Sequence, residues 1–551
     1  MELFQEGMIE SAMQTSFDNV PFRTSVTPEG KFLVAVHRPS FEVANLREHD
    51  QFAVLGYGPD GTARDNRGNF PEGDVRVGDA RPIYEIPNAF PFRGATYIDS
   101  GWADARAGNP GSIGLPPSSE CSLRRALSSF AAGKDFKSVL SELPLQVLYT
   151  LAACSTDPDE LVLLADFCCR FEYDQAGRPR GLLYHRDRDG RLRPGTIDFE
   201  LFEAVANNPF LPDPYKEVMV LRPGAQGDSE IVGDWSGDGS RVAEYLRANS
   251  YIPWGHYASN MASDAVRYRT ADLTEEDMRG LRHLYYQRVY VALAAKAGLE
   301  VPVRRRRLTA AELEELRRNI VRSTAGTVRG EATLWGWNYG YDLSGSGYRL
   351  HASHQMIHQQ YALVPESVAA ADGETVMPAF GIGDLAADTV DRYRRATGSD
   401  FFRDLLAAVR SNTRTDGGGG EHNLVVWEDE NVLLFVPKAQ VSQWELQLLV
   451  IADAGAGPVG NVVEADEKVR RSLDRGILTA QRIYAGLNAR MVTSIELPKR
   501  LGAANGQRLL YSFLPKLPWS MGGLSEAQLR FICGHYPEDF AACCRQQLTR
   551  S

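Results

Sequence analysis

Three of the ten histidines of the chain lie within eight positions of the segment RLHASHQMIHQQYALVP, at His351, His354 and His358. An imidazole can ligate a metal, act as a nucleophile or proton carrier, or form ordinary hydrogen bonds in a polar strand. The residue types around the histidines must distinguish a metal site, a catalytic site and a structural strand.

Alternation along a strand separates the segment into two faces, because successive side chains of an extended chain point to opposite sides. Neither face is cleanly apolar, whereas a half-buried strand normally has one hydrophobic face. A hydrogen-bonded polar strand therefore stays open, but the polarity of both faces favours a further role. The first face carries His354, Met356, His358 and Gln360, and the second carries Ser353, Gln355, Ile357 and Gln359.

A shared metal ion is disfavoured by the spacing of His354 and His358. Four strand residues separate them by roughly 13 Å, whereas a helix would bring positions i and i+4 together. The extended context therefore counts against a metal site.

Nucleophilic attack on phosphorus is the third alternative. A neutral imidazole, with an ordinary pKa near 6.5, can attack a phosphate and form a phosphoramidate that a second nucleophile resolves. Gln360 lies two residues beyond His358 on the same face and can donate to a phosphate oxygen without carrying charge. Asn338, Gly340 and Ser353, in the preceding strand and loop, can supply further donors.

The elements that must position these residues are readable from local patterns. Residues 270–298 have Thr274 before an acidic first turn, apolar residues at helical intervals and a closing Gly298, which predicts a long amphipathic helix. TLWGWNYGYD and the histidine segment, separated by a Gly/Ser turn, predict two strands and a loop. NLVVWEDENVLLFVPK predicts a hairpin that turns at EDEN, and residues 384–412 predict helix.

Composition sets the broad class of the protein. A chain of 551 residues with 43% hydrophobic residues and a net charge of -11 predicts a globular protein of two or three domains, or one duplicated fold with an extension. The negative charge argues against nucleic-acid or anionic-membrane partners. RRRR at 304–307 is the local exception, and we interpret it as a solvated approach to a helix capped by Thr309 and Glu312.

The seven cysteines include no C-x-x-C pair, which predicts reduced and mostly buried thiols. No apolar run is long enough for a signal peptide or membrane span, so the cytoplasm is the expected location.

WNYGYDLSGSGYRLHASHQMIHQQYALVP resembles the active-site segment of the histidine-triad (HIT) superfamily, in its branch of galactose-1-phosphate uridylyltransferases and dinucleoside-polyphosphate phosphorylases. In that family an Asn-x-Gly, a Gly-containing loop and a Ser lead to His-x-His-x-Gln and a proline. The matching residues here are Asn338, Gly340, Ser353, His358, Gln360 and Pro365. Further segments between about 200 and 545 resemble the same family in order and spacing.

The resemblance implies an α+β fold of tandem HIT-like halves, each an antiparallel sheet flanked by helices. It places an N-terminal extension rich in strands and loops at residues 1–150, a first half with the histidine segment at 151–365, and a second half at 366–551. The two halves are expected to join into one pseudo-symmetric sheet.

The implied function is nucleotidyl transfer or phosphorolysis through a covalent nucleotidyl-histidine on His358, with Gln360 steadying the phosphate oxygens. The expected partners are a nucleotide or nucleotide sugar and a phosphorylated acceptor or inorganic phosphate. No cofactor is required, while a metal and a homodimer are left open. The sequence departs from the family at Met356, which replaces the first histidine of His-x-His, and in lacking the paired cysteines of a zinc site. A noncatalytic nucleotide-binding module is therefore the alternative.

Three further residues are secondary candidates. Asn423 resembles a substrate-binding asparagine of the phosphorylases, and a turn residue at the start of a strand is the equal alternative. His354 shares the strand face of His358 and is a candidate for substrate binding, against a structural role. Lys438 could neutralise phosphate, but a lone lysine is more often solvated.

Overall fold

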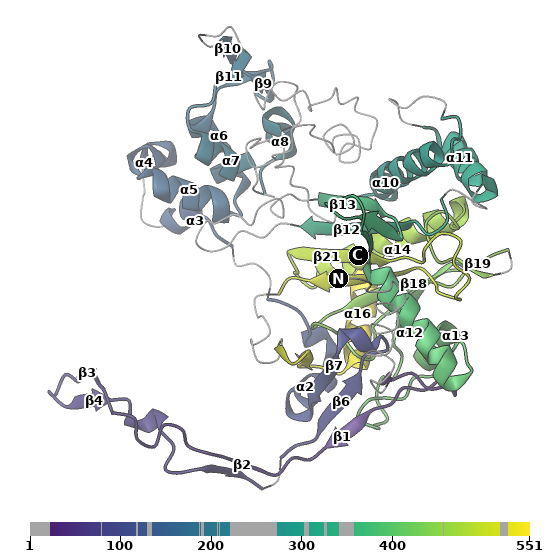
Figure 1. The fold of residues 1–551 in the computed structure, drawn as a ribbon. Helices are drawn as coiled ribbons and strands as arrows, with labels where there is room; N and C mark the ends of the chain where they lie inside the picture. The colour runs from purple at the N-terminus through teal and green to yellow at the C-terminus, as the bar shows by residue number, and fades with distance from the viewer. Residues whose placement is uncertain are drawn as a thin grey trace.

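A computed structural model describes residues 22–550, except 79, 117–119, 129–134, 187, 189–191, 207, 209, 221–272, 302–307, 324–327, 341–356, 456 and 518–526. Its described residues form helices and mainly antiparallel sheets, so the expected α+β class is confirmed. Seven strands make the largest sheet, in the order β13-β12-β21-β22-β18-β17-β16 (Figure 1). Their bounds are β12 (Ala332–Gly340), β13 (Ile357–Val364), β16 (Val425–Glu428), β17 (Val432–Phe435), β18 (Leu446–Val450), β21 (Met491–Leu497) and β22 (Leu510–Pro515).

Helices cover the two faces of this sheet unequally. One face packs against α10 (Glu275–Lys296), α14 (Glu467–Gly486) and α16 (Pro537–Arg550) over the largest hydrophobic core. The other face packs against α12 (Ile382–Thr397) and α13 (Phe401–Arg410), but this second core gathers β17, β18, β21 and β22 and includes no residue of β12 or β13. The β13 edge of the sheet therefore keeps one face that the described helices leave open.

Local sequence signals account for these elements. The predicted helix over 270–298 is confirmed as α10, where Thr274 and Asp277 form a capping box. The hairpin at EDEN is confirmed as β16 and β17, and Thr309 with Glu312 caps α11 (Ala310–Ser323). The helix expected over 384–412 is two helices, because Gly398 ends the first one with φ of 72°.

An antiparallel strand pair follows α10 and α11 as β12–β13 and follows α14 as β21–β22, and β12 pairs antiparallel with β21 at the junction. Residues 221–272, which precede α10, lie outside the described residues. The tandem halves thus stay a prediction.

The N-terminal region is built into the body of the protein. A four-stranded sheet, ordered β1-β6-β7-β23, joins β1 (Ala35–His37), β6 (Ile83–Pro87) and β7 (Ala95–Asp99) to β23 (Arg530–Cys533) near the C-terminus. Arg93, between β6 and β7, donates to buried Glu445 beside the large sheet at 2.8 Å. The N-terminal extension is accordingly tied to the last third of the chain.

The remaining elements lie in a helical subdomain, a protruding ribbon and short connections. The expected domain boundary at residue 150 falls inside the helix α5 (Leu145–Cys154), because the helical spacing that begins near residue 142 continues past residue 150. The subdomain comprises α3 (Leu123–Leu127), α4 (Phe136–Glu142), α5 (Leu145–Cys154), α6 (Pro158–Cys168), β8 (Phe171–Tyr173), β9 (Pro179–Leu182), β10 (Tyr184–Arg186), β11 (Leu192–Pro194), α7 (Phe199–Ala206) and α8 (Asp213–Val220). The ribbon comprises β2 (Phe41–Val43), β3 (Val54–Tyr57), β4 (Ala63–Asp65), η1 (Arg67–Asn69) and β5 (Val75–Val77). The connections include η2 (Pro91–Arg93), α2 (Ser100–Ala107), η3 (Pro110–Ser112), β14 (Ser367–Ala369), β15 (Val376–Pro378), β19 (Asp453–Ala454) and β20 (Gly457–Pro458).

All seven cysteines are free, and five of them are buried, as their spacing predicted.

Candidate active site

The pairing register of β12 aligns three polar positions in one row across the sheet. Two of them, Asn338 and His358, were candidates from the sequence, and Thr493 was not. His358 on β13 lies opposite Asn338 on β12, and Thr493 on β21 lies opposite Asn338 on its other side. Directly opposed residues on neighbouring strands share a sheet face and are separated by about 5 Å. The His358 side chain lies outside the described part of the chain, so the row is defined by strand positions.

Asn338 is oriented by a hydrogen bond across the sheet. The Thr493 hydroxyl donates to Asn338 Oδ1 at 2.8 Å, and both side chains are partly buried. No other described residue hydrogen-bonds the Asn338 side chain, which leaves its NH2 group able to donate to a ligand on the open face. Thr493 lies 155 positions after Asn338, and nothing in the local sequence points to it.

Gln359 and Gln360 divide β13 into two chemical faces. Gln359 accepts from Trp335 Nε1 at 3.3 Å and donates to the Leu281 carbonyl of α10 at 3.5 Å. Gln360 is exposed and lies opposite Gly336, which carries no side chain that would crowd it. The same residue type is thus structural at one position and available to a ligand at the next.

The helix side of the β12–β13 pair is tightly held. Trp335 and Trp337 of β12 are each 1% exposed, whereas Leu334, on the opposite face of the strand, is 44% exposed. Arg288 of α10 donates to the Tyr361 hydroxyl of β13. These contacts fix the strand whose other face carries the candidate residues.

A buried charge cluster lies beneath this part of the sheet. The guanidinium of Arg282, fully buried on α10, lies 4.6 Å from the Trp335 ring and donates to the Tyr511 hydroxyl at 2.9 Å. Tyr511 in turn donates to Glu496 at 2.5 Å. Arg282 Nε also lies 3.6 Å from the Asp474 carboxylate of α14. Arg282 thus faces buried Asp474 directly and reaches buried Glu496 through Tyr511.

Asp474 is the titratable group of this cluster. Burial raises its pKa to about 7, although Arg282 and the hydroxyl of Tyr286, which donates to it at 3.1 Å, act in the opposite direction. Asp474 also borders a cavity of about 250 Å³ between α10 and α14, lined by Glu275, Arg279, Arg471 and Arg475. The strands of the sheet separate Asp474 from the open face. We therefore assign Asp474 to the packing of the sheet.

The other predicted site residues are distributed as follows. Gly340 is the last residue of β12 and pairs with Met491. Ser353 and His354 lie outside the described residues, as does Met356. Asn423 precedes β16 at the edge of the sheet opposite β13, where its Oδ1 accepts from the Val425 amide at 2.9 Å. Five strand spacings, roughly 24 Å, separate β16 from β12, the strand of Asn338.

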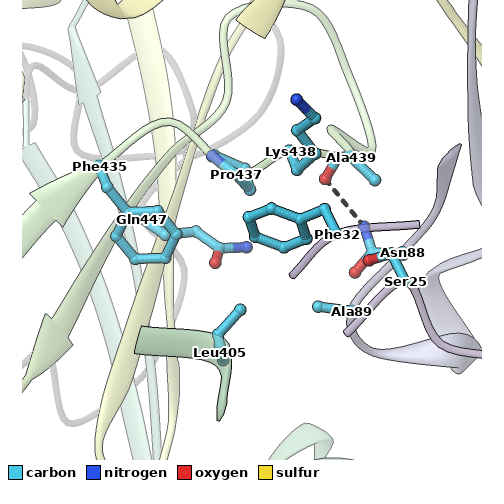
Figure 2. A pocket seen from close by; sticks show the side chains of 10 residues that line it. All are labelled: Ser25, Phe32, Asn88, Ala89, Leu405, Phe435, Pro437, Lys438, Ala439 and Gln447. Carbon is cyan, nitrogen blue, oxygen red and sulfur yellow. Dashed lines mark hydrogen bonds between the residues drawn. The ribbon is translucent and has the colours of Figure 1, made fainter. Parts of the chain in front are cut away.

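Lys438 is buried in the structure, whereas the sequence favoured a solvated lysine. It is 2% exposed, and its ammonium lies 2.5 Å from Glu538 and 2.7 Å from the Thr413 carbonyl. Figure 2 shows it above a cavity of about 10 Å³, where Asn88 of the N-terminal region donates to the Ala439 carbonyl at 3.1 Å. Lys438 is a buried structural partner of Glu538, which a single sequence could not reveal because Glu538 lies 100 residues away.

Clusters of metal ligands and membrane-spanning helices are both absent from the described residues. No three His, Cys, Asp or Glu side chains in the described ranges converge as metal ligands would. Among the helices that the structure describes, none has the apolar length to cross a membrane.

Comparison with known proteins gives distant structural matches. No family model and no curated protein matches the sequence. Solved structures that match include a galt-like protein from Arabidopsis thaliana at 15% identity, over 43% of this chain and 67% of that one, with a TM-score of 0.30. They also include an ADP-glucose phosphorylase from Arabidopsis thaliana with bound ADP-glucose, at 14% identity, 43% and 64% coverage and TM-score 0.30. A uridylyltransferase matches at 13% identity, 44% and 69% coverage and TM-score 0.31.

These matches span about two thirds of the compared chains. A TM-score near 0.3 does not establish a shared fold. The functional proposal rests on the residues of this chain.

Proposed function

We propose that this protein is a nucleotidyltransferase or phosphorylase that carries a nucleoside monophosphate on His358. The observation that supports this most directly is the register of β12 and β13, which aligns position 358 with Asn338 and places Gln360 two residues along the same open face. The opposite face of the same strands is occupied by aromatic packing and needs no ligand.

The proposed reaction has two displacements. In the first, an imidazole nitrogen of His358 forms a bond to the α-phosphorus of the nucleotide substrate while the bond from phosphorus to the leaving phosphate oxygen breaks. In the second, an oxygen of inorganic phosphate or of a phosphorylated acceptor attacks the same phosphorus and releases the histidine. Gln360 and the Asn338 amide donate to non-bridging oxygens, on which charge accumulates in each transition state.

The decisive experiment is intact mass measurement after incubation without acceptor. The protein is mixed in turn with nucleoside diphosphate sugars, nucleoside triphosphates, dinucleoside polyphosphates and adenylyl sulfate. A mass increase of one nucleoside monophosphate supports the proposal and identifies the base. His358→Ala should abolish the adduct, and His422→Ala, at an exposed histidine before β16, should retain it.

A noncatalytic nucleotide-binding module is the second candidate, favoured by Met356 at the place of the first histidine of the family motif. It predicts nucleotide binding by calorimetry with no adduct from any substrate. Turnover that persists in His358→Ala would refute the assignment of His358 as the nucleophile, and turnover of any kind would refute the noncatalytic module.

A further inference from the structure

A long two-stranded ribbon protrudes from the N-terminal sheet. Residues 41–78 continue β1 and β6 outward as the pairs β2–β5 and β3–β4, and the chain reverses in a turn where Gly58 donates to Thr62 and Gly61 to Gly58. Figure 1 shows this segment, hereafter the arm, leading away from the rest of the molecule. It is anchored at its base, where His37 pairs with Ile83.

The arm has no core of its own. No residue between 42 and 78 is buried. An isolated two-stranded ribbon is only marginally stable in water. Apolar side chains nevertheless recur along it and remain half exposed or more, or nearly so: Val43 50%, Leu46 91%, Phe52 50%, Val54 58%, Leu55 69%, Tyr57 74% and Val75 45%. Val43 and Val75 are paired across the ribbon, and exposed apolar residues gathered on one element of a soluble protein mark an interaction site.

The charges of the arm are largely satisfied within it. Arg76 pairs with Glu42 at 2.9 Å, Arg47 with Asp50 at 3.1 Å, and the Arg47 guanidinium lies 3.8 Å from the Phe70 ring centroid. With seven acidic residues and four arginines, residues 41–78 match the acidic balance of the whole chain. Anionic membranes and nucleic acids are therefore poor partners for it, whereas an apolar protein surface is a suitable one.

The body of the same chain exposes a second apolar hairpin. β14 and β15 pair antiparallel, no residue from 366 to 380 is buried, and the hairpin is anchored by Arg500, which donates to the Ala379 carbonyl at 2.9 Å. Its exposed apolar residues are Val368 41%, Val376 68%, Met377 47% and Phe380 67%. One chain thus carries two exposed apolar elements, and each could cover the other in a second copy.

We propose that the arm docks on a second copy of this chain, with the β14–β15 hairpin of that copy as its seat. Because each copy supplies one arm and one seat, the arrangement closes as a twofold dimer and leaves neither apolar element in water. At on the order of 100 Å² for a fully exposed apolar side chain, the seven arm residues would bury roughly 400 Å². A standard interface of about 800 Å² per partner, a little over half of it apolar, needs a similar area.

The test is the mass of the full chain in solution, by light scattering on a sizing column over about a hundredfold range of concentration. We expect twice the 61.0 kDa chain mass for the full protein. Deletion of residues 41–78, which leaves β1 and β6 joined by a loop, should give one chain mass. A full chain that is monomeric throughout, or a deletion variant that remains dimeric, overturns the proposal.

Point variants separate docking from damage to the fold. Leu46→Asp, Leu55→Asp and Tyr57→Asp combined should raise the dimer dissociation constant by about 100-fold or more, because they place charge in a buried interface. Three apolar residues of the helical subdomain that are 43–55% exposed serve as the control: Leu145→Asp, Leu183→Asp and Ile197→Asp should leave the dimer intact. Val376→Asp with Phe380→Asp should match the arm variants, and an unchanged dissociation constant there would refute the hairpin as the seat. No measurement uses a nucleotide, so the outcome is independent of the proposed catalysis.

Discussion

The two ends of the seven-stranded sheet differ in how their faces are used. At the β16 end, every residue of β17 and β18 is buried, and helices pack on both sides. At the β13 end, β12 alternates between buried Trp335 and Trp337 on one face and half-buried or exposed residues on the other. One sheet is thus wholly core at β17 and β18, and half core, half accessible surface at β12.

This difference explains where chemistry can be placed. A polar residue at the β16 end would lie in an apolar core and cost stability unless it found a partner. At the β13 end the alternation of the strand lets Gln359 serve the fold while Gln360 stays available. The comparison therefore predicts that substitutions on the helix face will change stability, whereas substitutions on the open face will change binding and turnover.

The largest effect is expected at Arg282. Arg282→Met removes the cation that faces buried Asp474 and donates to Tyr511, so it should lower the free energy of unfolding by about 3–5 kcal/mol. Arg279→Met, one turn earlier on α10, breaks an exposed pair with Glu276 and should cost about 1 kcal/mol or less. Urea unfolding of both variants measures the contrast, and equal losses would contradict the assignment of a buried charge cluster.

The next effect is the pH dependence that Asp474 gives to the helix face. Its pKa is raised from 3.8 to about 7, so the folded protein holds this proton while the unfolded chain has released it. Asp474 makes its full contribution to the free energy of unfolding below about pH 4. That contribution falls by about 1.4 kcal/mol per pH unit up to about pH 7. Asp474→Asn keeps an acceptor for Tyr286 and should flatten the unfolding free energy between about pH 5 and pH 7. An unchanged slope in that variant would show that another group titrates.

Sequence patterns predicted the helices and strands of this site better than they predicted which distant residues contact it. The helix over α10, the hairpin at EDEN and the strands flanking the Gly/Ser loop depend on local periodicity and capping, which are visible in one chain. Alternation assigned His358 and Gln360 to one face and the resemblance singled out Asn338, whereas the pairing of Asn338 with position 358 came from the strand register.

Long-range partners could not be predicted in the same way. Thr493 meets Asn338 only because β21 pairs with β12, and Lys438 is buried only because α16 brings Glu538 to it. Asn423 resembles a binding residue in its local context, yet the strand order sets it at the far edge of the sheet. Strand order and helix docking depend on the whole chain, and a short motif does not record them.

Adjacent glutamines offer a matched test at intermediate magnitude. Gln359→Ala leaves the Trp335 indole without its acceptor and should cost about 1–3 kcal/mol of stability. Gln360→Ala should leave stability within about 0.5 kcal/mol but lower turnover by about 100-fold, because it removes a donor to the phosphate oxygens. Thermal unfolding and adduct formation rates, measured on both variants, test the two faces; a stability loss in Gln360→Ala would refute the open face.

The smallest expected effect tests how the open face is organised. Thr493→Val preserves shape but removes the hydroxyl that donates to Asn338 Oδ1, so the amide loses its fixed orientation. Adduct formation should slow by about tenfold, in line with one neutral hydrogen bond of about 1 kcal/mol.

Thr333→Val is the matched change on the helix face, where the Thr333 hydroxyl donates to Glu496 at 2.6 Å. It should cost about 1.5–3 kcal/mol of stability, since the bond is to a buried carboxylate, and leave the adduct rate unchanged. A double-mutant cycle completes the test, because once Asn338→Ala has removed the amide, Thr493→Val has nothing left to orient and should have no further effect on the rate. Additive losses in that cycle would mean that Thr493 acts on the substrate itself, and the row across β13, β12 and β21 would then carry three independent contacts.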